Sequence, residues 1–212
     1  MAINKEQKAK AVVGVQGGKV AVMGAEGEWG TPQDFKYLTS VSLETNIEDF
    51  EQYADDERVV LIPSDNSIDG TIGTTAKDVA FEKAAGYLQE LDGGTLADIK
   101  IHGYTRCCFY FEFTNIDQVT GQPYKVKTWL LNAELKKTGE THETNTNTPT
   151  GATYEYPISV YGLNVKDSAG TADAVDDNGF VICAYKVHSY PGDEDYATFG
   201  DAVPEPQLPA SE

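Results

Sequence analysis

Carboxylates are the most concentrated reactive groups in this chain, and they gather in one short stretch. The sequence SLETNIEDFEQYADDE, residues 42–57, holds seven of them, and the next base is Arg58. Clustered carboxylates could bind a metal ion, and a pair could act as general acid and base if burial raised the pKa of one. Seven in sixteen residues are typical of a solvated segment instead. The stretch therefore predicts neither catalysis nor a metal site.

The same stretch is not a simple acidic run, because apolar side chains interrupt it at Leu43, Ile47, Phe50 and Tyr53. A helix would place like charges three or four residues apart, with no opposite charge to offset them. As the distal part of a long hairpin, its apolar residues could instead meet a neighbouring molecule. The pattern favours an arm that contacts another subunit.

The other candidate motifs lack the residue spacing that their chemistry requires. His102, His142 and His188 stand in unrelated places, and none has a ligand three or four residues away. The glycine-rich VGVQGGKV lacks the spacing of a phosphate loop, and a hairpin turn explains it better. DAVDDNG, residues 173–179, resembles a calcium loop, but Tyr185 then falls where a bidentate glutamate is required. We expect no enzyme activity, no catalytic residue, no metal and no cofactor.

The cysteines and the N-terminal residues indicate the cellular compartment of the protein. Cys107 and Cys108 are adjacent in a strand-like run, so they should point to opposite faces and not pair with each other. Together with Cys183, they are expected to be free, buried thiols in a reducing compartment. No apolar segment typical of a secretory signal or a membrane helix is present. We expect a soluble protein made in the cytoplasm, with no membrane anchor.

The charge balance limits the partners. The chain of 212 residues has 16 Lys+Arg against 34 Asp+Glu, a formal net charge of −18. Nucleic-acid binding draws most of its affinity from bases that neutralise phosphates, and anionic membranes attract bases as well. Binding to DNA or to a membrane surface is therefore disfavoured, whereas repulsion of DNA is not.

The elements that would position these residues are mostly strands. Residues 11–23 predict two short strands around a Gly17–Gly18 turn, and one amphipathic helix is predicted over 77–91. Two alternating runs, 106–116 and 123–135, predict a long β-hairpin. Further strands are expected at 37–45, 57–63, 154–163 and 179–190. The sum is an α+β chain that is mostly antiparallel β.

The remaining segments have the composition of arms and loops. Residues 1–10 are polar and predict a flexible N-terminal arm, and 141–153 form a Thr/Asn-rich loop. Residues 191–212 carry six acids, four prolines and no base, which predicts an extended or disordered C-terminal tail. The domain itself is expected to span 11–190.

The order of these features resembles the major tail protein, or tail tube protein, of long-tailed bacteriophages. The resemblance covers about residues 10–190. It rests on the Tyr-Ala-Asp-Asp loop (53–56), on GTIGTTAKDVAFEKAAGYLQE with its trailing DGG (70–94), on the hairpin 107–137 and on the strand YEYPISVYG (154–162). It implies an antiparallel β-sandwich or rolled sheet with one flanking helix, related to type VI secretion tube proteins.

The resemblance also implies an assembly. Subunits of that family form hexameric rings that stack around a tape-measure protein, and DNA later passes through the tube without specific binding. Tail terminator and tail-tip or baseplate proteins would be further partners, and the protein would pass from the host cytoplasm into the virion. A protruding acidic loop at 44–58 would contact the next ring through Glu44, Ile47, Glu48, Asp49, Phe50, Glu51, Tyr53, Asp55 and Asp56.

A second reading from another class remains open. An acidic β-sandwich binding module could decorate a capsid or recognise a carbohydrate, with Phe109, Tyr110, Phe111 and Trp129 of the hairpin as a stacking platform. The alternative is that these rings are core or a subunit interface.

Overall fold

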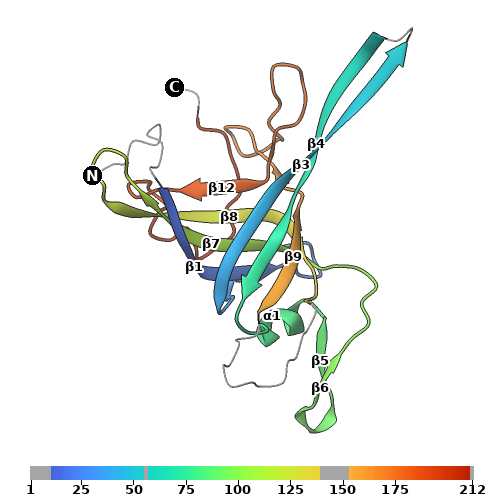
Figure 1. The fold of residues 1–212 in the computed structure, drawn as a ribbon, viewed down its shortest axis with the longest axis vertical. Helices are drawn as coiled ribbons and strands as arrows, with labels where there is room; N and C mark the ends of the chain where they lie inside the picture. Colours follow the sequence, from blue (N-terminus) through green and yellow to red (C-terminus); the bar gives the residue numbers. More distant parts are fainter. Residues whose placement is uncertain (1–10, 55–56, 139–152, 211–212) are drawn as a thin grey trace, which may run out of the picture.

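The computed structural model describes residues 11–54, 57–138 and 153–210 and is mostly β, with one short helix (Figure 1). The fold class expected from the sequence is thus confirmed. The expected arm at 1–10 and nearly all of the loop at 141–153 lie outside the described residues. The elements are β1 (Ala11–Val22), β2 (Gln33–Asp34), β3 (Leu38–Ala54), β4 (Glu57–Thr74), α1 (Val79–Ala84), β5 (Leu88–Glu90), the 3-10 turn η1 (Asp92–Gly94), β6 (Leu96–Asp98), β7 (Arg106–Ile116), β8 (Pro123–Leu135), β9 (Tyr154–Val160), β10 (Leu163–Asn164), β11 (Cys183–Ala184) and β12 (Lys186–Ser189).

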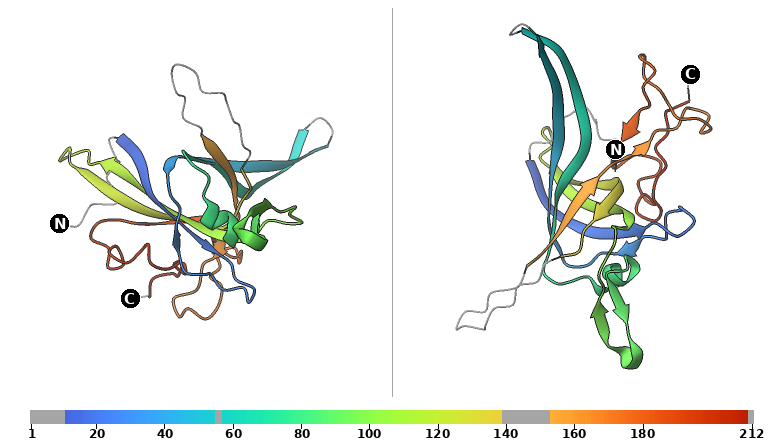
Figure 2. Two further views of the ribbon diagram at one scale, coloured as in Figure 1. Left: turned by 90° about the horizontal axis from the view of Figure 1, so that it is seen from below. Right: turned by 90° about the vertical axis from the view of Figure 1, so that its right-hand side faces the viewer.

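One curved antiparallel sheet organises the molecule (Figure 2). Its strands run in the order β2-β1-β7-β8-β9-β4-β3, and β12 pairs with β8. The sheet rolls until β1 and β3 face each other across a groove, which Val12, Val15 and Val41 line. Within the described residues, no backbone ladder joins β1 to β3, so the roll stays open at this seam.

The predicted hairpin is the centre of the sheet. β7 and β8 pair from Arg106 opposite Glu134 to Ile116 opposite Pro123. The strand alternation sends Cys107, Phe109 and Phe111 into one core cluster, and Cys108 and Tyr110 into another. Adjacent cysteines therefore do lie on opposite faces, and the sheet is buried on both.

The larger core lies inside the roll, beneath α1. Phe35, Phe81, Phe109 and Tyr156 meet edge to face, with ring centroids 5.2–5.9 Å apart. Such geometry suits the ring quadrupoles and adds to the gain from burial. The strands and the helix are thus held by one aromatic cluster.

The smaller core covers the opposite face of β7 and β8, where Tyr110, Trp129 and Leu131 pack against Phe199. We expected residues 191–212 to be extended or disordered, but residues 191–210 lie along the sheet and Phe199 is 7% exposed. The reason is that Phe199, one of two aromatic residues in this segment, fills a pocket whose walls include residues of β1, β7 and β8. Composition does not report such a pocket.

Two local predictions were wrong. Residues 11–22 form one strand instead of two, because Gly14 and Gly17, both with positive φ, introduce bulges and do not reverse the chain. The helix expected over 77–91 ends at Ala84. Gly86 has a φ of 76°, a left-handed conformation that terminates helices, and the following residues become β5.

Candidate assembly surfaces

The acidic stretch forms the outer part of a long β-hairpin. β3 and β4 pair from Leu38 opposite Thr74 to Ala54 opposite Glu57. β9 pairs with β4 only over Ile68–Thr74, so the hairpin residues farther out have no third strand among the described residues. We call residues 47–54 of β3 and 57–66 of β4 the ribbon; it extends well beyond the sheet (Figure 1).

The ribbon is long for a pair of strands with no further support. Eight residues of β3 at about 3.3 Å each give a length of about 26 Å. An isolated two-stranded hairpin is marginally stable in water, and independent stability needs a third strand or a surface to pack on. The ribbon therefore has the architecture of an element that is completed by another molecule.

The structure gathers most of the predicted contact residues in this ribbon. Glu44 lies exposed at its base, directly opposite Asp69. The ribbon itself contains Ile47, Glu48, Asp49, Phe50, Glu51 and Tyr53, whereas Asp55 and Asp56 lie outside the described residues.

The register of the ribbon pairs its acidic positions with uncharged residue types. In the ladder, Glu48, Asp49 and Glu51 stand opposite Ser64, Pro63 and Leu61, and Arg58 stands opposite Tyr53.

A second unpartnered element is the outer edge of β1. β2 pairs only with Lys19 and Val20, so along Ala11–Gln16 that edge has no partner strand among the described residues. Val12 and Val13 there are 66% and 52% exposed. Open apolar edges invite another strand, and a monomer normally protects them.

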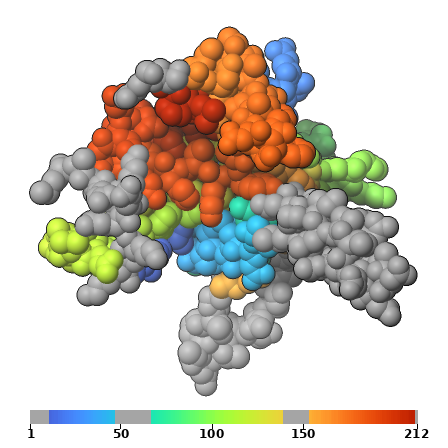
Figure 3. Space-filling view, turned by 90° about the horizontal axis from the view of Figure 1, so that it is seen from above, coloured from blue at the N-terminus to red at the C-terminus, as the bar shows by residue number. Residues whose placement is uncertain are grey.

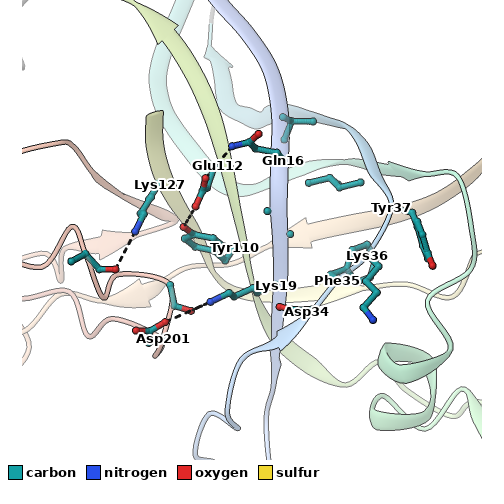
Figure 4. A pocket seen from close by; sticks show the side chains of 16 residues that line it. Gln16, Lys19, Asp34, Phe35, Lys36, Tyr37, Tyr110, Glu112, Lys127 and Asp201 are labelled. Atoms are coloured by element: carbon teal, nitrogen blue, oxygen red, sulfur yellow. Dashed lines mark hydrogen bonds and ion pairs between the residues drawn. The ribbon is translucent and has the colours of Figure 1, made fainter. Parts of the chain in front are cut away.

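Two lysines beside a cavity clamp the C-terminal segment to the sheet (Figure 4). The ammonium of Lys19 donates to the Gly200 carbonyl at 2.8 Å, and that of Lys127 donates to the Tyr196 carbonyl at 2.6 Å. Both lysines line this cavity of about 710 Å³ but point to backbone oxygens at its rim. The arrangement holds the segment on the sheet.

Buried acids, the usual signature of general acid or base chemistry, have structural roles here. Asp78 caps α1 by accepting from the Phe81 amide at 2.9 Å and also accepts from the Lys36 amide. Burial raises the pKa of Glu82, although Lys77 lies 3.3 Å from its Oε2 and opposes the shift. Both acids lie within the segment 77–91 that the sequence predicted as a helix, but the burial of Glu82 carried no sequence signal.

The histidines and cysteines do not form a site. His102 is exposed, His142 lies outside the described residues, and Nδ1 of His188 shares a hydrogen bond of 2.8 Å with Thr128. The described residues contain no group of three or more side chains that could hold a metal ion. None of the three cysteines forms a disulfide, and Cys183 is exposed, contrary to expectation.

The aromatic residues of the hairpin are core. Phe109, Tyr110, Phe111 and Trp129 are between 0% and 7% exposed, so they offer no platform for a sugar ring or another ligand. This overturns the stacking platform of the alternative reading. Among the described residues, no helix is long and apolar enough to cross a membrane.

No protein-family model and no curated protein matches the chain. Among solved structures, the chain is similar to the tube-terminating cap of the anti-feeding prophage, with 11% identity and a TM-score of 0.38 over 76% of this chain and 90% of that one. It is also similar to a chain of the PVC extracellular contractile injection system, solved as an extended sheath-tube complex. There the identity is 11% and the TM-score 0.35, over 68% of this chain and 83% of that one. Both scores are below 0.5, so the argument for function rests on the surfaces described above.

Proposed function

We propose that this chain is the structural subunit of a phage tail-like tube, in which rings of subunits stack into a polymer. The ribbon carries this proposal, because it is a long β-element with no support within its own sheet. The sequence resemblance to major tail proteins independently suggests that the same segment contacts the next ring.

The geometry of the two unpartnered elements suits an open polymer. The ribbon and the outer edge of β1 are different surfaces, so each would meet a surface unlike itself. Contacts of that head-to-tail kind build rings when the rotation closes and filaments when it does not. In the proposed tube, edge pairing closes a ring that is sixfold by analogy with the family, and the ribbon joins successive rings.

The charge fits a conduit for DNA. With a net charge of −18, an acidic wall would not retain phosphates, since binding requires bases. We propose that the rings stack around a tape-measure protein and that DNA later passes through the tube without specific binding. Terminator and baseplate proteins would cap the two ends, and assembly would take place in the host cytoplasm before the virion is complete.

The test removes the ribbon and keeps the sheet. Replacing residues 47–66 with Asn-Gly leaves Asn46 opposite Ser67, a pair that a two-residue turn can join. We expect the wild type to form rings or tubes as its concentration rises, visible by negative-stain electron microscopy and sedimentation. The variant should keep a β-type circular dichroism spectrum and unfold cooperatively but fail to stack.

A matched variant separates charge from shape. Changing Glu48→Gln, Asp49→Asn and Glu51→Gln keeps the hairpin and removes three carboxylates. If charge directs stacking, this variant should require a higher protein concentration to form tubes. Normal tubes from the variant without the ribbon would exclude the ribbon as the stacking element.

A further inference from the structure

The outer surface of the sheet has a distinct character over β3, β4 and β9. Along these strands, Val41, Ile72 and Ile158 belong to the larger core inside the roll. The residues between them point the other way, because side chains alternate along a strand. We call the surface they form the wall face, and the ladders align it in two rows, Ser42–Thr71–Pro157 and Glu44–Asp69–Ser159.

The wall face is the open part of this outer surface. Over β7 and β8 the same side of the sheet carries the smaller core and is covered by residues 191–210. In Figure 3 the orange and red residues that follow β9 gather on one side, whereas β3, in light blue, lies at the surface. Ser42, Glu44 and Pro157 are exposed, and Asp69 and Thr71 are half-buried. The wall face is therefore in contact with solvent in the isolated subunit.

The composition of the wall face differs from that of a docking surface. Its two rows hold small polar residues, one proline and two acids, with no aromatic ring, no long apolar side chain and no base. Protein interfaces draw most of their energy from buried aromatic and arginine anchors. The outer edge of β1, where Val12 and Val13 are exposed, has the apolar character that the wall face lacks. The wall face thus suits contact with water better than contact with another subunit.

The two acids of the wall face face each other. Glu44 stands directly opposite Asp69 in the ladder, and like charges at such positions lower the stability of a sheet. Asp69 accepts hydrogen bonds from Asn46 at 3.5 Å and from Ser67 at 3.3 Å. These donors are neutral and do not compensate the charge. The pair therefore leaves an excess of negative charge on the surface, at a cost in stability that a role in function would explain.

The bases that border the wall face are directed at other groups of the chain. Arg106 of β7 lies 3.5 Å from Glu134 of β8, which itself stands opposite Ser159. The ammonium of Lys136 lies over the Tyr104 ring, 5.8 Å from its centroid. Neither base is therefore placed to offset the two acids of the rows.

We propose that the wall face lines the channel of the tube. The inference rests on the proposed function, and it names the surface that DNA would pass. The ribbon continues β3 and β4 beyond the sheet (Figure 1), so a ribbon that reaches the next ring sets these strands along the direction of stacking. The wall face then runs along the tube and offers a passing polyanion small side chains and acids, which give phosphates no counter-charge. Glu44 belongs to the channel in this arrangement and not to the contact between rings.

The first test measures which reagents reach the wall face before and after assembly. In a Cys183→Ser background, Ser42→Cys places one exposed thiol on it, because Cys107 and Cys108 are 1% and 0% exposed. A small maleimide should label this thiol in free subunits and in tubes. A maleimide coupled to a folded protein wider than the channel should label free subunits and lose its reaction in tubes.

The two reagents distinguish three locations. Thr71→Cys repeats the measurement on the neighbouring strand and should behave alike. Tubes labelled by both reagents would put the face on the outside, and tubes labelled by neither would put it in a subunit contact. Either result overturns the inference and leaves the proposed function intact, whereas a wild type that forms no tubes at any concentration would reject both.

The second test reverses the charge of the wall face. Tubes of the double variant Glu44→Lys, Asp69→Lys should retain a short fluorescent single-stranded oligonucleotide at low salt and protect it from nuclease, since lysines bind phosphates. The matched control is Glu26→Lys with Glu28→Lys, which makes the same change of charge at exposed positions outside the sheet. Any oligonucleotide that the control retains should be digested. Equal protection in the two variants, or protection in neither, would overturn the inference.

Discussion

The indole Nε1 of Trp129 donates a hydrogen bond of 2.7 Å to the backbone carbonyl of Phe199, 70 residues later in the chain. The Phe199 ring fills the same cluster as the Trp129 ring, so a side-chain contact and a backbone contact fix one point of the C-terminal segment. These two contacts with Trp129 attach residues 191–210 to the domain.

Phe199→Ala should therefore lower the free energy of unfolding by about 3–5 kcal/mol, since it empties a closed aromatic site. Denaturant titration followed by Trp fluorescence would measure the change. Phe180→Ala makes the same substitution at a ring that is 72% exposed and should change stability by less than about 0.5 kcal/mol. Equal losses in the two variants would mean that the segment is not packed as described.

The lysine clamp predicts local opening without global unfolding. Lys127→Met removes the ammonium that donates to the Tyr196 and Ala197 carbonyls but keeps most of the apolar stem. Hydrogen exchange of amides in residues 193–201 should become faster, while exchange in β7 and β8 should stay slow. Lys100→Met, at an exposed position, is the control and should change neither.

Close backbone packing predicts a glycine requirement in β4. A Cβ at Gly70 would lie 2.0 Å from the Ser42 carbonyl oxygen of β3, so neighbouring backbone must shift. Gly70→Ala should cost about 1–3 kcal/mol of stability, as overpacking does. Gly103→Ala, where a Cβ would meet nothing within 4 Å, should leave the unfolding midpoint nearly unchanged. A tolerated alanine at residue 70 would contradict the β3–β4 register.

The burial of Glu82 predicts that the stability of the fold depends on pH. Burial is the main cause that raises its pKa above 4.5, so the protonated form stabilises the fold. This contribution is complete below pH 4.5 and is lost as the pH rises through the folded-state value. The stability of the wild type relative to Glu82→Gln should therefore fall between pH 4.5 and neutrality.

Glu90 provides the control, because its contribution to stability should depend on pH with the opposite sign. A hydrogen bond from Lys83 lowers the pKa of this exposed carboxyl below 4.5. Its contribution is present above pH 4.5 and is lost as the pH falls through the folded-state value. Denaturant titrations of Glu90→Gln at several pH values should show a small change of that sign. The same sign at both positions would refute the buried environment of Glu82.

The sequence predicted most of the central fold because its signals are local. Alternation along β7 and β8 placed Cys107 and Cys108 on opposite faces, and both are buried there. Crowded like charges argued against a helix over residues 42–57, and the segment is instead largely strand. Spacing alone was also sufficient to discount a calcium loop at 173–179.

What the tertiary structure decided depends on partners distant in sequence. A glycine pair indicates a turn or a bulge equally well, and only the ladder with β7 makes Gly17 part of a bulge. Composition made residues 191–212 look like a tail, but Phe199 packs in a cluster with Tyr110, Trp129 and Leu131, which lie 68 or more positions earlier in the chain. The sequence by itself determined the strand pattern, the charge and the acidic arm, since these are properties of adjacent residues. Only the fold decided which surfaces stay unpartnered, because β9 pairs with β4 only over Ile68–Thr74 and leaves the ribbon beyond it as two strands.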